Sequence, residues 1–179
     1  MRKLLLICTI VAFASGGAHA LPSKPYVGLF ADAAHSIEAV SNPGGFFPFM
    51  LWIWWLPSEH GLMASEFMMT YPSNVIAGTV IANPLLSVSL GCIGYVCPTF
   101  VECQVDWVWT HQQACYLTDA LPSVIEIGPR PGASVIEAAN CDPGYPLETV
   151  VVYNKFALNR DAVIGVESQS WGAIKSLYR

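Results

Sequence analysis

Five polar residues have the side chains that a metal site or a catalytic site would use: Asp32, His35, His60, Asp106 and His111. Imidazole and carboxylate groups act as metal ligands and as general acids and bases. Neither the spacing from Asp32 to His35 nor that from Asp106 to His111 provides the closely paired His or Cys ligands of a structural zinc site. We therefore expect neither a metal nor a cofactor. The histidines are expected to lie in loops and at strand ends.

Hydrolytic chemistry has equally little support in the sequence. There is no Gly-x-Ser-x-Gly elbow, and no Cys stands beside a His. Glu66, Glu102 and Asp106 lie on predicted strands and could face one groove, as the paired carboxylates of a glycosidase do. Their alternative role is to mark strand positions that face solvent. The sequence therefore predicts a protein that is not an enzyme, with a hydrolase as the weakest alternative.

The tryptophans are the more informative candidates for a binding site. Side chains alternate between the two faces of a strand, so Trp107, Trp109 and His111 would share one face of one strand. Trp52 and Trp54 would share a face of another strand. An exposed Trp can insert into a protein partner or stack on a sugar. The alternative for each pair is burial in the core, and the sequence leaves both open.

The strand that must position Trp52 and Trp54 is the most apolar stretch of the chain, residues 46–56. It is too short for a membrane helix, which needs about 20 apolar residues. Its aromatic and β-branched residues favour a strand, and both faces of that strand are apolar. The segment 62–71 follows a turn at 57–61 and is predicted to return beside it as a hairpin.

The rest of the chain consists of short apolar runs separated by turn residues. Further strands are predicted at 26–30, 75–81, 85–90, 99–109, 114–118, 124–128, 133–139 and 148–153. The strands 124–128 and 133–139 are expected to form a second hairpin. Many short strands at regular spacing indicate an all-β fold, an antiparallel β-sandwich over residues 21–158. Residues 159–179 are then a linker and a short C-terminal tail.

The first 20 residues have the pattern of a signal peptide. Arg2 and Lys3 precede an apolar run, and Ala18-His19-Ala20 has the small residues of a cleavage site. The mature chain would keep 6 basic against 13 acidic residues, which argues against nucleic acid and against anionic membranes. We expect a secreted protein, extracellular, periplasmic or at the cell surface, with no transmembrane helix in the mature chain.

The cysteines that remain after cleavage are disulfide candidates, as expected for an exported protein. Cys92 and Cys97 flank a four-residue turn, which would bring their Cα atoms near the ~5.5 Å that a disulfide requires. A second bridge is predicted between Cys115 and Cys141, since each lies in the C-terminal half. Cys103 would then be the unpaired thiol.

The chain end returns to apolar character after a polar stretch. Ser170 could cap a short helix. The apolar residues of this segment are Trp171, Ile174, Leu177 and Tyr178. We interpret them as a docking element for an export or surface-attachment machine. The alternative is that the tail packs on Trp52 and Trp54 of the same molecule.

From Gly61 the sequence GLMASEFMMTYPSNVI resembles cohesin-like domains, in which an apolar strand ends near a Tyr, a turn follows, and a Val-Ile strand begins. The ending SWGAIKSLYR resembles the C-terminal tails of exported bacterial proteins. The resemblance implies a secreted bacterial β-sandwich, immunoglobulin-like or cohesin-like, and carries over no functional residue. With the tryptophans, we expect a non-catalytic module that binds a protein partner or itself at the cell surface or in the envelope. A carbohydrate-binding module is the alternative.

Overall fold

The computed structural model describes residues 21–42, 45–88, 95–160 and 163–164, and these fold into strands and loops without a helix. The first layer is a five-stranded sheet. Its strands lie in the order β13 (Val151–Val152), β1 (Tyr26–Phe30), β3 (Phe47–Leu56), β9 (Val108–Leu117), β6 (Val75–Ala82). We call it the first sheet. The long strand β3 lies at its centre and pairs antiparallel with both β1 and β9.

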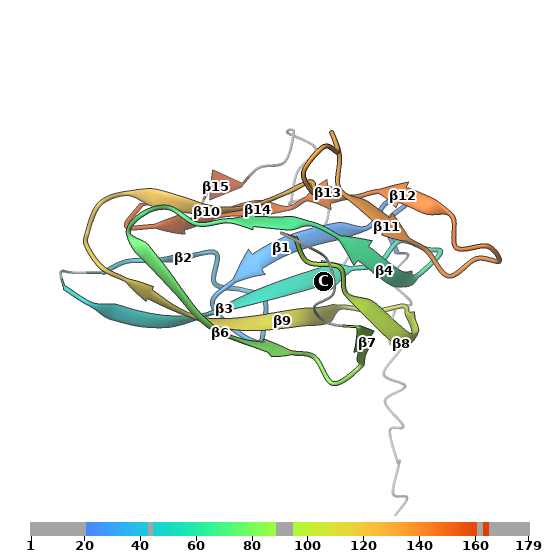
Figure 1. Cartoon of the computed structure of the whole chain (residues 1–179), viewed down its shortest axis with the longest axis horizontal. Coiled ribbons are helices and arrows are strands. Elements are labelled where there is room, and N and C mark those ends of the chain that lie inside the picture. Colours follow the sequence, from blue (N-terminus) through green and yellow to red (C-terminus); the bar gives the residue numbers. More distant parts are fainter. Residues whose placement is uncertain (1–20, 43–44, 89–94, 161–162, 165–179) are drawn as a thin grey trace, which may run out of the picture.

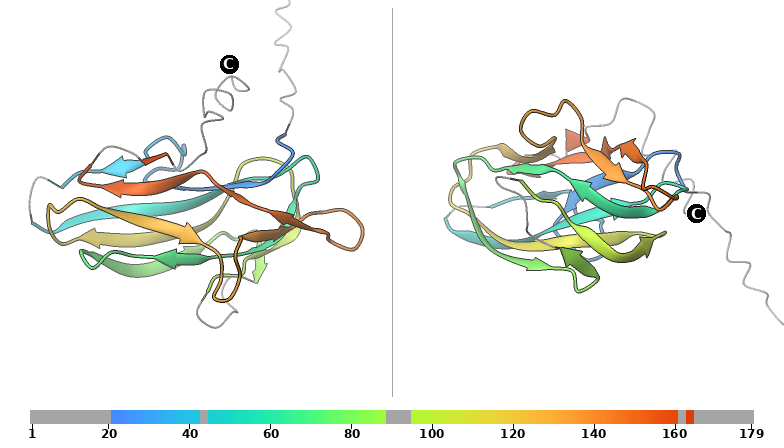
Figure 2. Two further views of the ribbon diagram at one scale, coloured as in Figure 1. Left: turned by 90° about the horizontal axis from the view of Figure 1, so that it is seen from above. Right: turned by 45° about the vertical axis from the view of Figure 1, so that its right-hand side comes forward.

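Two smaller sheets form the second layer. One has the order β15 (Val163–Ile164), β14 (Asn154–Leu158), β10 (Ser123–Gly128), β5 (Met68–Thr70), with β2 (Ala39–Val40) parallel to β14. The other has the order β12 (Leu147–Thr149), β11 (Glu137–Ala139), β4 (Leu62–Glu66), β8 (Thr99–Gln104), β7 (Leu86–Val88). In Figure 1 their strands β10, β14, β4 and β11 lie above β3 and β9, whereas β7 and β8 lie lower, at the level of β6; Figure 2 shows the layers from other sides. The predicted all-β sandwich is confirmed.

The core lies between the layers because one face of β3 is buried and the other is not. Leu51, Ile53 and Trp55 are buried, whereas Trp52 and Trp54 on the opposite face remain partly exposed. This is the alternation of a strand covered on one side only. The core side is completed by apolar side chains of both layers, among them Val27, Leu29, Phe67, Leu117, Ile125 and Phe156.

The chain passes from the first sheet to the second layer at Asn154, and the Asn154 side chain links the two layers by hydrogen bonds to Leu29. The parallel pairing of β1 with β13 ends at Val27 and Val152. Two residues later Asn154 Oδ1 accepts a hydrogen bond from the Leu29 N–H at 2.8 Å, and its Nδ2 donates to the Leu29 carbonyl at 2.8 Å. Both bonds are buried, so the carboxamide replaces the backbone partner that Leu29 lacks there.

The predicted hairpin of residues 46–71 is wrong. β3 pairs with β1 and β9, whereas β4 pairs with β8 and β11 in the other layer. The turn between them is tight: the Gly61 N–H donates to the Ser58 carbonyl at 2.9 Å, and Gly61 has a φ of +77°. The turn leads the chain to the opposite layer, where Leu62 of β4 is buried in the core.

The second predicted hairpin is also wrong, because β10 pairs with β14 and β5, and β11 pairs with β12 and β4. β9 runs straight through residues 110–113, which lie between the predicted strands 99–109 and 114–118. β15 pairs with β14 beyond the predicted end of the domain at Leu158.

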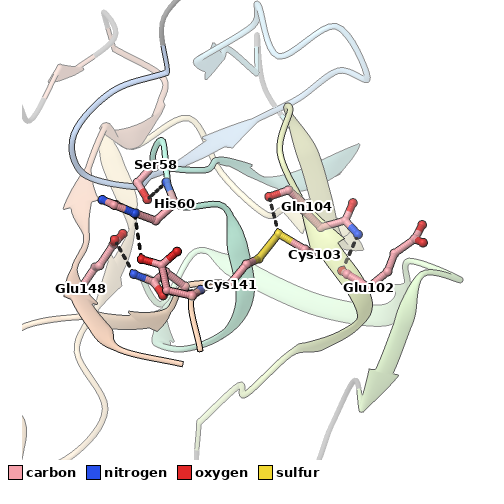
Figure 3. The surroundings of a disulfide bond; sticks show 9 residues. Ser58, His60, Glu102, Cys103, Gln104, Cys141 and Glu148 are labelled. Atoms are coloured by element: carbon pink, nitrogen blue, oxygen red, sulfur yellow. Dashed lines mark hydrogen bonds and ion pairs between the residues drawn. A yellow bond between two sulfur atoms is a disulfide. The ribbon is translucent and has the colours of Figure 1, made fainter. Parts of the chain in front are cut away.

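One disulfide prediction is wrong: Cys141 bridges to Cys103, with a Cα–Cα distance of 5.8 Å, and Cys115 is a free, buried thiol. The side chain of Cys115 faces the core from β9, in the first sheet. Cys103 and Cys141 lie on β8 and just after β11, on either side of β4 (Figure 3). Cys97 takes part in a disulfide, and its predicted partner Cys92 lies outside the described residues.

The predicted signal peptide, residues 1–20, and the tail residues Trp171, Ile174, Leu177 and Tyr178 also lie outside the described residues. Within the described ranges no helix has the length and hydropathy needed to span a membrane.

Candidate functional site

The first sheet contains no Asp, Glu, Lys or Arg in any of its five strands. The apolar side chains on one face of this sheet belong to the core. The side chains of the other face point away from the core. At the β1 end of this face Phe30 and Leu56 are buried. We call the surface formed by the remaining side chains of β3, β9 and β6 the aromatic face, and its main members are Met50, Trp52, Trp54, Ile76, Ile81, Trp109, Gln112 and Tyr116. Ile76 and Ile81 are 52% and 49% exposed, so this face is open to solvent at the β6 side.

A β-bulge brings the two predicted tryptophan pairs together on the aromatic face. The register of β3 against β9 shifts between Ile53 and Trp54, so that Ile53 lies opposite His111 and Trp54 lies opposite Trp109. Thr110 is the extra residue, which a bulge leaves without a direct partner on the facing strand. Opposite residues of an antiparallel pair point to the same side. Trp109 therefore joins Trp54, although the sequence pattern assigned the two to separate sites.

The same bulge makes the predicted position of His111 wrong. Without an extra residue, His111 would share a face with Trp109. With the bulge it lies opposite the core residue Ile53 and is only 2% exposed. His111 is therefore part of the core side, and it contributes nothing to the aromatic face.

The indole rings of the aromatic face contact one another in a fixed pattern. Trp52 and Trp54 are stacked, with ring centroids 6.1 Å apart and planes at 19°. Trp109 meets Trp52 edge-on at 5.4 Å and 78°, and Trp107 meets Trp54 at 6.5 Å and 70°. Offset-stacked and edge-to-face pairs are the preferred aromatic geometries. All four rings are half-buried, so they are neither core residues nor freely exposed ones.

His35 is a member of this cluster that the sequence pattern missed. Its ring stacks on Trp54 with centroids 5.0 Å apart and lies 4.3 Å from the ring of Trp107. The residue has a φ of +45°, a left-handed conformation that is uncommon outside glycine. The imidazole Nδ1 is buried without a hydrogen-bond partner among the described residues. Burial lowers the pKa of His35, opposed by the negative charge of Asp32, so the ring stays neutral at pH 7.

Asp32 is the residue that shapes the loop carrying His35. Its Oδ1 accepts hydrogen bonds from the N–H groups of Ser36 and Ile37, at 2.9 and 2.8 Å, and its Oδ2 accepts the Ser36 hydroxyl at 2.7 Å. Burial acts to raise the pKa of Asp32, but these hydrogen bonds together hold it below its ordinary value. Asp32 is thus a turn residue, and the only signal of its role in the sequence was its spacing to Ser36.

The remaining polar candidates do not assemble a catalytic site. His60 Nδ1 contacts Asp142 Oδ2 at 2.9 Å, but the Ser58 hydroxyl accepts from the His60 backbone N–H at 3.2 Å instead of meeting the imidazole (Figure 3). Asp106 accepts from the Trp107 N–H at 2.7 Å. Within the described ranges no three His, Cys, Asp or Glu side chains form a group that could hold a metal ion.

The carboxylates proposed for a groove are also separated. Glu66 lies opposite Glu137 across β4 and β11, and it is ion-paired with Arg130 Nε. Both glutamates line a shallow surface pocket of about 210 Å³, whereas Glu102 is not among its lining residues. This pocket lies on the β4–β11 sheet, away from the aromatic face.

No protein-family model matches this chain, and no curated protein matches it. Solved structures do. The seventh ScaB type I cohesin of Pseudobacteroides cellulosolvens is 10% identical, covers 82% of this chain over 98% of its own length, and superposes with a TM-score of 0.50. The cohesin of a type I cohesin–dockerin complex from Clostridium thermocellum is also 10% identical, with 79% and 96% coverage and a TM-score of 0.50. At this identity the likeness is one of fold, and it confirms the cohesin-like β-sandwich.

Proposed function

We propose that this chain is a non-catalytic, exported β-sandwich module that binds a protein partner through the aromatic face. The observation that carries the proposal is an uncharged sheet face on which four half-buried tryptophans contact one another. Exposed apolar surfaces of this kind mark interaction sites, and Trp is enriched among residues that dominate binding energy. The fold likeness to a cohesin that was solved in complex with a dockerin supports the proposal.

The ring geometry supports a protein partner over a polysaccharide. A sugar stacks on an open, flat ring face. Here Trp52 and Trp54 stack on each other, and His35 lies over Trp54. The edge of Trp109 meets Trp52. The ring faces are thus occupied by one another, and the apolar side chains of Met50 and Ile81 lie on the same face of the sheet. An apolar surface of this kind suits the apolar side chains of a protein.

A cross-linking experiment tests the proposal. The photoreactive residue benzoylphenylalanine replaces Met50 on the aromatic face, and it replaces Val101 on β8 as the control, since Val101 is 69% exposed in the other layer. After irradiation of cells that export the protein, cross-linked peptides are identified by mass spectrometry. We expect a protein partner cross-linked from position 50 and absent from position 101, and absent again when Trp52→Ala is added.

Three results would overturn it. The first is the same set of products from both positions. The second is cross-linking from position 50 only to residues 165–179 of the same molecule, which would mean that the tail covers the face. The third is sedimentation with cellulose, chitin or peptidoglycan that is lost in Trp52→Ala, which would assign the face to a polysaccharide.

A further inference from the structure

The strand β6 forms the edge of the first sheet beside the aromatic face. It pairs with β9 on one side, and no described strand pairs with its other side. It is eight residues long, whereas the edge strands β13, β15, β5, β12 and β7 have two or three residues. Proteins usually protect a long edge with charged residues or proline. β6 has neither, and Ile76, Val80 and Ile81 are 38–52% exposed.

The backbone of β6 directs hydrogen-bonding groups toward this open edge. The Thr118 N–H donates to the Asn74 carbonyl, and the Asn83 N–H donates to the Thr110 carbonyl, which fixes the bonded pairs at both ends of the strand. Bonded and non-bonded pairs alternate in an antiparallel ladder. The residues whose backbone groups then point to the open edge are Val75, Ala77, Val80 and Ala82. The Val75 N–H is already donated to Pro72, which leaves its carbonyl.

The sequence of β6 contains a repeat whose two copies lie on either side of its centre. It reads Val-Ile-Ala, then Gly78 and Thr79, then Val-Ile-Ala again. The register against β9 shifts between Ala77 and Val80, so the central two residues form a bulge. As a result the side chains of Ile76 and Ile81 point to the aromatic face. The side chains of Ala77 and Val80, whose backbone groups point to the open edge, lie on the opposite face.

We propose that β6 pairs antiparallel with β6 of a second copy of this chain, across a two-fold axis between Gly78 and Thr79. In this register Ile76 lies opposite Ile81 of the second copy, and Ala77 lies opposite its Val80. Each residue meets one that points to the same face, and the edge-directed backbone groups of Ala77 and Val80 meet each other. In a two-fold interface both subunits use the same surface patch, so β6 alone provides both sides of this interface. The chain carries a net charge of −5, but β6 is uncharged, so two copies approach without local repulsion.

The dimer extends the function proposed above without depending on it. The two first sheets become continuous, and their aromatic faces lie side by side on the same side of the joined sheet. The aromatic face itself stays open. One strand edge buries less than the ~800 Å² per partner of a standard interface, so we expect a dissociation constant in the micromolar range, on the order of 1–100 μM.

Sedimentation velocity of the mature chain over this concentration range tests the pairing, with three variants. Ala77→Lys and Val80→Glu each place a charge opposite an apolar residue of the second copy, and each should raise the dimer dissociation constant at least about tenfold. The double variant Ala77→Lys/Val80→Glu places the introduced ammonium group of one copy opposite the introduced carboxylate of the other, and should restore dimerisation. Val101→Lys is the matched surface control and should dimerise like wild type.

Circular dichroism and the melting temperature establish that each variant folds. A wild-type chain that remains monomeric throughout overturns the proposal, as does a dimer that both single variants leave unchanged. A double variant that stays as weak as the single ones overturns the register. Because Met50 and Trp52 lie two strands away from the open edge, loss of the dimer and loss of partner binding are separate outcomes.

Discussion

The indole rings of Trp52 and Trp109 meet edge-to-face, with centroids 5.4 Å apart and planes at 78°. The two residues belong to neighbouring strands and come together because β9 contains one extra residue at Thr110. This contact unites two pairs of tryptophans into one cluster on the open side of the first sheet. Trp55 lies on the opposite face of β3 and is fully buried, so it belongs to the core and not to this cluster.

Truncation of Trp52 and of Trp55 should therefore have very different effects on stability. Trp55→Ala leaves a cavity in the core and should lower the free energy of unfolding by about 3–5 kcal/mol. Trp52→Ala removes mainly ring contacts at a half-exposed site and should cost roughly 1 kcal/mol. Urea unfolding of both variants measures the difference. Equal losses would mean that the aromatic face is core.

Gly61 should be intolerant of a side chain because the disulfide passes over it. A Cβ at this position would lie 2.5 Å from Cys103 Sγ and 2.7 Å from Cys141 Sγ. Gly132 has a similar φ, +86° against +77°, but open space around it. Gly132→Ala should cost roughly 1–2 kcal/mol of conformational strain, and Gly61→Ala should cost more.

The control is the same pair of substitutions in a chain that carries Cys103→Ser and Cys141→Ser. There the excess cost of Gly61→Ala should shrink, because a hydroxyl can move away where a bridged sulfur cannot. An unchanged excess would show that Gly61 is required for the turn alone.

Cys115 should be unreactive in the folded protein. Burial in the core raises the pKa of its thiol to about 12, and the thiolate is the form that reacts. We expect no labelling of the native mature chain by iodoacetamide at pH 8, and labelling of Cys115 after unfolding without reductant. Peptide mapping that found Cys103 labelled would contradict the bridge from Cys103 to Cys141.

Stability should fall as the pH is lowered below about 6.5, the ordinary pKa of His, in part because of His35. Burial lowers its pKa in the folded state, so the unfolded chain binds the proton more readily between the two pKa values. The stability that neutral His35 provides is present above the unfolded pKa and is lost as the pH falls through this window. His35→Phe keeps a ring against Trp54 and Trp107 and should reduce the slope of the unfolding free energy against pH below about pH 6.5. Parallel slopes for both proteins would refute this.

The sequence predicted the fold class because its signals are local. Short apolar runs, turn residues and the absence of helical periodicity indicate a β-sandwich whichever strands are neighbours. The pairing partners depend on long-range packing instead. Both faces of β3 are apolar, so its pattern cannot tell whether residues 62–71 lie beside it or in the opposite layer. A turn such as that ending at Gly61 is compatible with either.

The sequence predicted which tryptophans belong to the candidate site, but it did not predict that they form one cluster. Trp52, Trp54, Trp107 and Trp109 were identified as two pairs. One inserted residue, Thr110, reverses the faces of a strand with a side-chain period of two, and nothing in the local sequence marks it. His35 was read as a polar candidate because its aromatic neighbours are distant in sequence. The bridge from Cys103 to Cys141 was missed for a related reason: cysteine spacing does not determine connectivity.

The central claim is that the aromatic face binds a protein partner, and the dissociation constant of the purified complex tests it most directly. The partner is the protein cross-linked from position 50, and the variants are Trp52→Ala and Trp109→Ala, with Val101→Ala as the control. We expect each Trp variant to raise the dissociation constant at least about tenfold, as loss of a central aromatic anchor does. Val101→Ala should leave it unchanged. Folded Trp variants that bind as tightly as wild type would contradict the account.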